Sequence, residues 1–221
     1  MTCLSLLLET RDLYFSYNGS KPVLKGVNLK LSPGQKVALW GRNGAGKTTL
    51  FRVIMGLKKP SGGEVFFRGK SASNDRRTLG ELRKAVGFLF QDPEDQLFCP
   101  TLLEDIAFGP LNLGFKAEDA REKAFETLRI VKLERFADAP PHTLSGGQKR
   151  LGALAALLAM DPEALLLDEP TGDLDEGARE ILEDILVSTQ AALLVASHDA
   201  GFLEKITSSA YCLENGILIN V

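Results

Sequence analysis

The chain has 221 residues, 44% of them hydrophobic and 25% charged, which is the composition of one ordinary globular domain. This composition excludes a disordered chain, a collagen-like chain and a disulfide scaffold. The 26 basic and 29 acidic residues leave a net charge of −3, so the overall charge does not favour nucleic acid as a partner. No apolar run approaches the roughly 18 to 20 residues of a membrane-spanning helix.

The cysteines are Cys3, Cys99 and Cys212, which are far apart and form no CxxC pair. We therefore expect neither a zinc site nor a redox pair, and a reducing cytosol fits best.

Short apolar strands punctuated by turns dominate the first ninety residues. The alternation of apolar and polar side chains and the turn residues predict strands at 12–17, 27–31, 36–40, 65–68 and 86–90. A glycine-rich turn follows the strand at 36–40, and a helix is expected from 47 to 56.

The middle of the chain has helical spacing of its apolar residues. We expect helices over 102–136 and 145–160, then a buried strand at 164–167, a helix at 177–188 and a strand at 192–196. A hairpin at 213–218 turns at Asn215-Gly216. This order predicts an α/β domain with a mainly parallel sheet and helices on both faces. We expect residues 1–90 and 161–221 to form the core and residues 91–160 an inserted helical lobe.

Residues 41–48 match the phosphate-loop pattern GxxxxGK[ST] at every position. Glycines let backbone N–H groups turn toward phosphate oxygens, and the following helix directs its positive end at the same anion. A chance match is the alternative, but the position between a strand and a helix favours the phosphate loop. The expected nucleotide-binding residues are Gly41, Arg42, Asn43, Gly44, Ala45, Gly46, Lys47, Thr48 and Thr49.

Two carboxylates follow the buried strand at 164–167. Ligands of parallel sheets bind where strands end, so Asp168 is placed to hold Mg²⁺ and Glu169 to orient or deprotonate a water molecule. Thr48 would supply a hydroxyl ligand to the same metal. A solvated turn is the alternative interpretation of this acidic pair.

The sequence Leu-Ser-Gly-Gly-Gln at 144–148 precedes the second predicted helix, and it resembles the signature of the ATP-binding cassette (ABC) ATPases. Other motifs of that family follow the same order along the chain. Tyr17 matches the aromatic residue that stacks on adenine, Gln91 the Q-loop glutamine, and His198 the switch histidine. Residues 172–175 occupy the D-loop position, although Gly172-Asp173 departs from the pattern of many relatives.

The resemblance implies the ABC ATPase fold, with an antiparallel β subdomain beside the parallel sheet, and ATP and Mg²⁺ as cofactors. It also implies a head-to-tail dimer, as a homodimer or with a second ABC ATPase, closing around two ATP molecules. The implied catalytic residues are Glu169, His198, Gln91 and Lys47; the metal ligands are Thr48, Gln91 and Asp168; the further nucleotide contacts are Ser145, Gly146, Gly147, Gln148 and Asp175. An ordinary strand tyrosine, a structural histidine, a structural glutamine and a plain helix cap remain alternatives for Tyr17, His198, Gln91 and Ser145.

Residues 91–98 and 104–114 resemble the ATPases of energy-coupling factor importers, especially the cobalt and nickel type. This implies an ATPase at the cytoplasmic face of the cell membrane, held there by a membrane coupling protein with a small membrane substrate-binding protein. Leu97 and Phe98 are candidate anchors for a membrane-protein helix, or else core residues. Many such ATPases carry a C-terminal extension, and this chain stops at Val221, so we expect a weak resting dimer that ATP tightens.

Other functions remain as alternatives. These are the ATPase of a vitamin importer, the ATPase of another ABC transporter class, and an ABC ATPase without transport. A single cassette without a long coiled coil disfavours repair and translation proteins. The cargo is bound outside this chain, so no motif here separates cobalt, nickel and vitamins.

Overall fold

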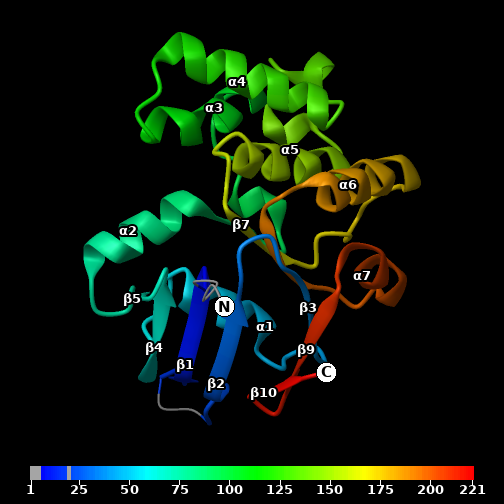
Figure 1. Ribbon diagram of the computed structural model, residues 1–221. Helices are drawn as coiled ribbons and strands as arrows, with labels where there is room; N and C mark the ends of the chain where they lie inside the picture. Colours follow the sequence, from blue (N-terminus) through cyan, green and yellow to red (C-terminus); the bar gives the residue numbers. More distant parts are fainter. Residues whose placement is uncertain (1–5, 19–20) are drawn as a thin grey trace. The chain divides into compact units, whose positions relative to one another are not determined.

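The computed structural model describes residues 6–18 and 21–221, so Cys3 and Gly19 lie outside the described residues. The chain forms two compact units (Figure 1). The first, which we call the sheet unit, consists of the residues up to Phe88, Glu163–Asp168 and Gln190–Val221. The second, the helical unit, consists of Leu89–Pro162 and Glu169–Thr189. Within the described ranges, no helix has the length and hydrophobicity needed to cross a membrane.

The sheet unit is built around a six-stranded sheet in the order β10-β9-β3-β8-β7-β6. β3 pairs in parallel with both β8 and β9, and β7 pairs in parallel with β8. β10 closes the sheet as the antiparallel partner of β9, across the predicted Asn-Gly turn. The strands are β3 (Lys36–Trp40), β6 (Val86–Leu89), β7 (Ala164–Asp168), β8 (Ala192–Ala196), β9 (Ser209–Glu214) and β10 (Ile217–Asn220).

A second, four-stranded sheet in the same unit has the order β2-β1-β4-β5, and all its pairings are antiparallel. The register between β1 and β2 shifts after Thr10. The buried Thr10 hydroxyl donates to the carbonyl of Val27 at 2.8 Å and accepts from the amide of Leu29 at 3.0 Å, which satisfies both groups at the irregularity. The strands are β1 (Leu8–Phe15), β2 (Leu24–Leu31), β4 (Gly62–Phe67) and β5 (Lys70–Ser71).

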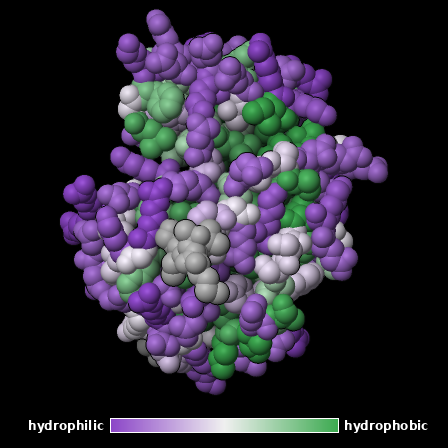
Figure 2. Space-filling view, viewed as in Figure 1, coloured by the Kyte–Doolittle hydropathy of each residue, from purple (hydrophilic) through white to green (hydrophobic). Residues whose placement is uncertain are grey.

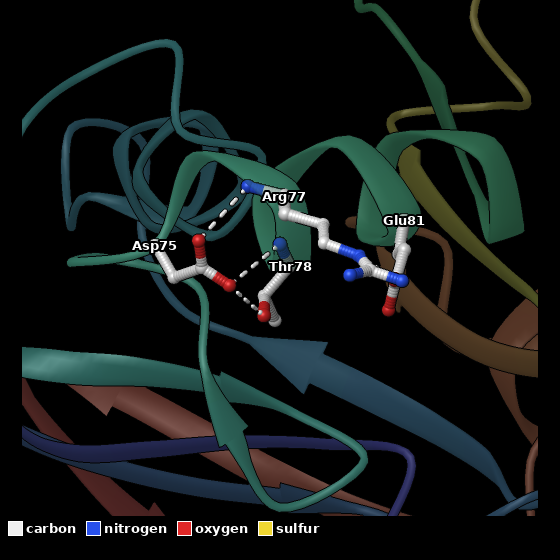
Figure 3. Close-up of polar contacts among 4 residues, drawn as sticks. All are labelled: Asp75, Arg77, Thr78 and Glu81. Atoms are coloured by element: carbon white, nitrogen blue, oxygen red, sulfur yellow. Dashed lines mark hydrogen bonds and ion pairs between the residues drawn. The ribbon is translucent and has the colours of Figure 1, made fainter.

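Three helices complete the sheet unit: α1 (Lys47–Ile54), α2 (Arg76–Ala85) and α7 (Ala200–Ile206). Sequence patterns predicted α1 only. Asp75 caps α2, accepting from the amides of Arg77 and Thr78 and from the Thr78 hydroxyl (Figure 3). These hydrogen bonds, first the one from the Thr78 hydroxyl, lower the pKa of the Asp75 carboxyl.

The helical unit contains α3 (Leu102–Asn112), α4 (Ala117–Ile130), α5 (Gly146–Leu158) and α6 (Glu176–Ser188), with short 3₁₀ turns at Pro93–Asp95, Glu134–Phe136 and Pro141–Thr143. The helical stretch expected over 102–136 is divided between α3 and α4 by a turn at Gly114, whose φ is +97°. α5 packs against α3, α4 and α6.

The predicted fold class is confirmed, with a mainly parallel sheet, an antiparallel β subdomain and a helical subdomain. Several predicted bounds were wrong. β1 begins four residues before the expected strand and ends at Phe15, because its antiparallel partners β2 and β4 pair with residues 8–11 as well. Residues 169–189 group with the helical unit, since α6 packs against α5.

Candidate nucleotide site

The strand ends of the central sheet bring three predicted site segments to one edge. Ala196, the last residue of β8, is in register with Leu39 of β3 on one side and with Asp168 of β7 on the other. The phosphate loop therefore leaves the sheet beside His198, and Asp168 ends the next strand. The carboxyl edge of a parallel sheet is where such folds bind ligands.

The phosphate loop needs glycine at both of its ends. Gly41 has a φ of +152°, and a Cβ there would lie 2.6 Å from the carbonyl oxygen of Leu213. Gly46, the N-cap of α1, has a φ of +106°, and its Cβ would lie 2.9 Å from a methyl group of Val23. Because glycine has no side chain to cap the helix, the first amides of α1 are left to a ligand or solvent. The tip of the loop, residues 42–44, is exposed.

Lys47 is the charged centre of this loop. Its side chain is 7% exposed, and its Nζ donates to the carbonyl of Gly41 at 2.6 Å and lies 3.3 Å from Nε2 of His198. An ammonium group has no acceptor, so in this contact His198 Nε2 accepts and the ring proton sits on Nδ1. The sheet unit thus joins two of the predicted catalytic residues by a direct hydrogen bond.

Tyr17 lies two residues beyond the end of β1, so it is not an ordinary strand tyrosine. Its hydroxyl shares a hydrogen bond with the Thr49 hydroxyl at 3.1 Å, which ties it to the first turn of α1. The edge of its ring meets Phe15 at a centroid distance of 4.8 Å, and the Lys58 ammonium lies 5.8 Å from the ring centroid. Tyr17 is 39% exposed, so the ring is partly accessible for stacking.

A cavity of about 720 Å³ opens beside the phosphate loop. Residues 21–23, 25 and 213–216 line it together with loop residues 42–45. Three of its lining side chains are basic and one, Glu214, is acidic, so the space beside the loop favours an anionic ligand.

The metal ligands predicted in the sheet unit fit Mg²⁺ by their chemistry. Thr48 offers a hydroxyl, and Asp168, which is 1% exposed, offers a carboxylate. Hydroxyl and carboxylate oxygens are ligands that Mg²⁺ prefers, completed by phosphate oxygens and water. Within the described residues no three His, Cys, Asp or Glu side chains cluster as an all-protein metal site.

The signature residues begin α5 in the helical unit. Ser145 is the N-cap: its hydroxyl accepts from the Gln148 amide at 3.3 Å, and its own amide donates to Gln148 Oε1 at 2.9 Å. The helix-cap interpretation of Ser145 is therefore confirmed locally, which leaves its role toward ATP as a prediction. A Cβ at Gly146 would lie 3.3 Å from Cβ of Asp173, so the D-loop packs closely on this helix start.

Gln91, Glu169 and Asp175 also lie in the helical unit. Glu169 has a φ of +49°, in the left-handed region, and its carbonyl accepts from the Gly172 amide at 3.2 Å. Asp175 caps α6 by accepting from the Ala178 amide at 2.8 Å. Local capping therefore explains Asp175 without a partner subunit, and its predicted contact across a dimer stays a prediction.

Sequence reasoning missed Arg150, which is 4% exposed and hydrogen bonds to the carbonyls of both Gln91 and Glu169. A charged residue on the apolar helix 145–160 was the available signal.

The sequence left two interpretations for Leu97 and Phe98, a core residue or an anchor for a membrane-protein helix. The two residues differ in burial. Leu97 is buried, whereas Phe98 is 67% exposed and its ring meets Phe108 edge-on at 5.1 Å.

Comparison with known proteins agrees with these features. Residues 24–172 match the family described as ABC transporter. The chain is 47% identical over 213 residues to a putative ABC transporter ATP-binding protein of Nitratidesulfovibrio vulgaris, covering 96% of this chain and 78% of that protein. It is 44% identical over 216 residues to the energy-coupling factor transporter ATP-binding protein EcfA of Methanocaldococcus jannaschii, covering 96% and 77%.

Solved structures show the same fold. CbiO1 of Clostridium perfringens, part of the ABC transporter complex CbiONQ, has a TM-score of 0.84 at 32% identity, covering 97% of this chain and 87% of that one. A dimeric ATP-binding cassette bound to ADP and inorganic phosphate also has a TM-score of 0.84, at 29% identity and 96% coverage of both chains. The phosphate loop, the signature helix and these matches together show that the chain belongs to the ABC transporter family and is an ATPase of that family.

Proposed function

We propose that this chain is the ATPase subunit of an energy-coupling factor importer, and that ATP binding and hydrolysis drive uptake of a metal ion, cobalt or nickel. The main support is the 44% identity, over 96% of the chain, to a protein named as an energy-coupling factor ATPase. The segments 91–98 and 104–114 support the metal type by their resemblance to it. An importer of a vitamin is the second candidate, because that relative's name specifies no cargo.

The proposed reaction is the attack of water on the γ-phosphorus of ATP. The bond to the β,γ-bridging oxygen breaks, ADP leaves, and the proton of the attacking water passes to Glu169 or to solvent. Lys47 and the amides of the phosphate loop bind the phosphates, and His198 contacts the γ-phosphate. Gln91 would offer its amide oxygen to the metal and to the water. Positioning and charge neutralisation supply most of the rate.

Mg²⁺, when bound, neutralises charge on the β- and γ-phosphates. Thr48 and Asp168 are its proposed ligands, supported by their oxygen chemistry and by the position of Asp168 at the end of β7.

The proposed active form is a head-to-tail dimer, with a second copy or with another ABC ATPase. Ser145, Gly146 and Gly147 offer a hydroxyl and helix-start amides, which is a second anion site on the same chain as the phosphate loop. A solved relative is itself described as a dimeric cassette bound to ADP and phosphate. Two such chains would complete two sites.

A membrane coupling protein is the proposed partner that places this ATPase at the cytoplasmic face of the cell membrane. Exposed aromatic and aliphatic side chains support the contact: Phe98, Phe108, Leu111 and Phe115 are each more than 40% exposed, on or beside α3. Figure 2 shows hydrophobic residues at the surface of this α3–α4 region among hydrophilic neighbours. An apolar helix of the partner is the occupant that such a surface fits.

Tagged Glu169→Gln protein, incubated with ATP and Mg²⁺ and recovered from detergent-solubilised membranes, tests the proposal. We expect it to capture a multi-span coupling protein and a small membrane binding protein, which mass spectrometry would identify. Glu180→Gln, on the exposed face of α6, is the matched control and should hydrolyse ATP at the wild-type rate.

The identity of the small membrane protein separates metal from vitamin import. Capture of large paired permeases would refute the energy-coupling factor assignment. Recovery of soluble partners alone would refute transport and leave the ATPase chemistry standing. Phe98→Ser should weaken capture without changing ATP hydrolysis, whereas Ile130→Ser, which is also exposed, should capture as the parent does.

A further inference from the structure

Arg150 is a buried charge whose contacts the nucleotide chemistry does not require. It lies in the second turn of α5 and is 4% exposed. Its Nη1 donates to the carbonyl of Glu169 at 3.1 Å, and its Nη2 donates to the carbonyl of Gln91 at 3.0 Å. Nη2 also lies 3.9 Å from Oδ2 of Asp173. Burying a guanidinium group is costly unless acceptors face its N–H groups. These contacts therefore help to offset the burial of Arg150.

The first of these contacts reaches a backbone in an uncommon conformation. Glu169 has a backbone φ of +49°, a value that residues other than glycine and asparagine rarely adopt. Its carbonyl receives two donors, the Gly172 amide and Arg150 Nη1. A residue stays in such a conformation only when its surroundings hold it there. Arg150 supplies one of the two hydrogen bonds to that carbonyl.

The second contact reaches the segment that begins at Gln91. This segment is also held by Gln96, whose Oε1 accepts from the Phe90 amide at 2.8 Å, and by an ion pair between Lys149 and Glu94. Lys149 precedes Arg150 on the same helix. The first two turns of α5 therefore hold both the segment at 91–96 and the segment at 169–173.

We propose that Arg150 is a positioning residue that fixes the backbone at Glu169 and Gln91 together, and so aims the water-orienting carboxylate. The proposal rests on the proposed role of Glu169 in hydrolysis. Two separate donors of a rigid, planar group span the two carbonyls, which are 78 residues apart in the sequence. A lysine keeps the charge but is a single flexible point donor, so it cannot reproduce this fork.

The test is Arg150→Lys in the full chain, with kcat, KM for ATP, ATP affinity and thermal unfolding measured together. Because small misplacement of a reacting group is costly, we expect kcat to fall about 10- to 100-fold. ATP affinity should stay within about twofold, since the phosphates are bound by the loop at 41–48. Arg129→Lys on α4, an exposed arginine, is the matched control and should behave as wild type.

Two readouts separate positioning from a merely structural role. In the Glu169→Gln background, Arg150→Lys should slow single-turnover hydrolysis by clearly less than it does beside an intact Glu169, because its effect through that carboxylate is already removed and only its hold on the Gln91 backbone remains. Hydrogen exchange should accelerate in peptides that contain the Gly172 amide, and this reports on the contact even if hydrolysis is too slow to measure.

Wild-type kcat in Arg150→Lys, unchanged exchange at Gly172, or losses that multiply in the double variant would each overturn the proposal. If Glu169→Gln itself hydrolyses ATP at the wild-type rate, the proposed role of Glu169 fails first and the inference fails with it. A slow Glu169→Gln beside a normal Arg150→Lys refutes the inference alone.

Discussion

Replacing Lys47 by methionine is the sharpest perturbation of the phosphate site. The side chain is 7% exposed, so methionine, with a similar unbranched stem, fills the space without the charge. A hydrogen bond to a charged group contributes about 1.5–3 kcal/mol. Losing one such bond to a phosphate should therefore raise the dissociation constant of ATP about 10- to 150-fold.

The nucleotide series makes this expectation specific. Isothermal titration should show the full loss for ATP, a similar loss for ADP, and little change for AMP, because Lys47 is proposed to bind the β- and γ-phosphates. Lys84→Met, on the exposed face of α2, is the matched control and should bind all three nucleotides as wild type does. Unchanged ATP affinity in a folded Lys47→Met protein would remove Lys47 from the site and refute the reasoning.

Three further outcomes follow from single contacts. Thr10→Val should lower the free energy of unfolding in urea by about 1–3 kcal/mol, because it leaves a buried amide and carbonyl without their partner. Asp75→Ala should lower the melting temperature at pH 7; since the folded pKa is lowered, the gap should close as pH falls below about 4. Burial, then the Asp105 carboxylate, raises the pKa of the Cys99 thiol to about 11. Alkylation of Cys99 at pH 8, followed by peptide mass spectrometry, should therefore be slow, rise about tenfold per pH unit to pH 10, and accelerate in Asp105→Asn.

The elements that sequence predicted well are those specified by local chemistry. The phosphate loop, β3 and the start of α1 follow from one glycine pattern between an apolar strand and a helix. The closing hairpin follows from Asn215-Gly216, whose φ values of +50° and +83° suit its tight turn.

The missed features lack a local pattern strong enough to mark them. α7 has only seven residues, too few for a period to emerge, and is fixed by its cap Asp199 and three buried apolar side chains. α2 is strongly charged and has few apolar residues, so its N-cap residue Asp75 was the main sequence signal that a helix begins there. Arg150 could be seen as a charge in an apolar helix, but its two acceptors lie at positions 91 and 169, and no local pattern joins them.

The contact between Lys47 and His198 explains how the phosphate site tolerates a nearly buried ammonium. An unpaired charge that is 7% exposed would be costly, and the Gly41 carbonyl together with His198 Nε2 compensates for it. On the proposed role of Lys47, a phosphate would compete with both acceptors, so part of its attraction to Lys47 would replace contacts that already exist. Because β3 and β8 are paired in register, the sheet places the start of the loop beside the segment that carries His198. A bound phosphate would then exchange these hydrogen bonds for its own, beside strands whose register is already fixed.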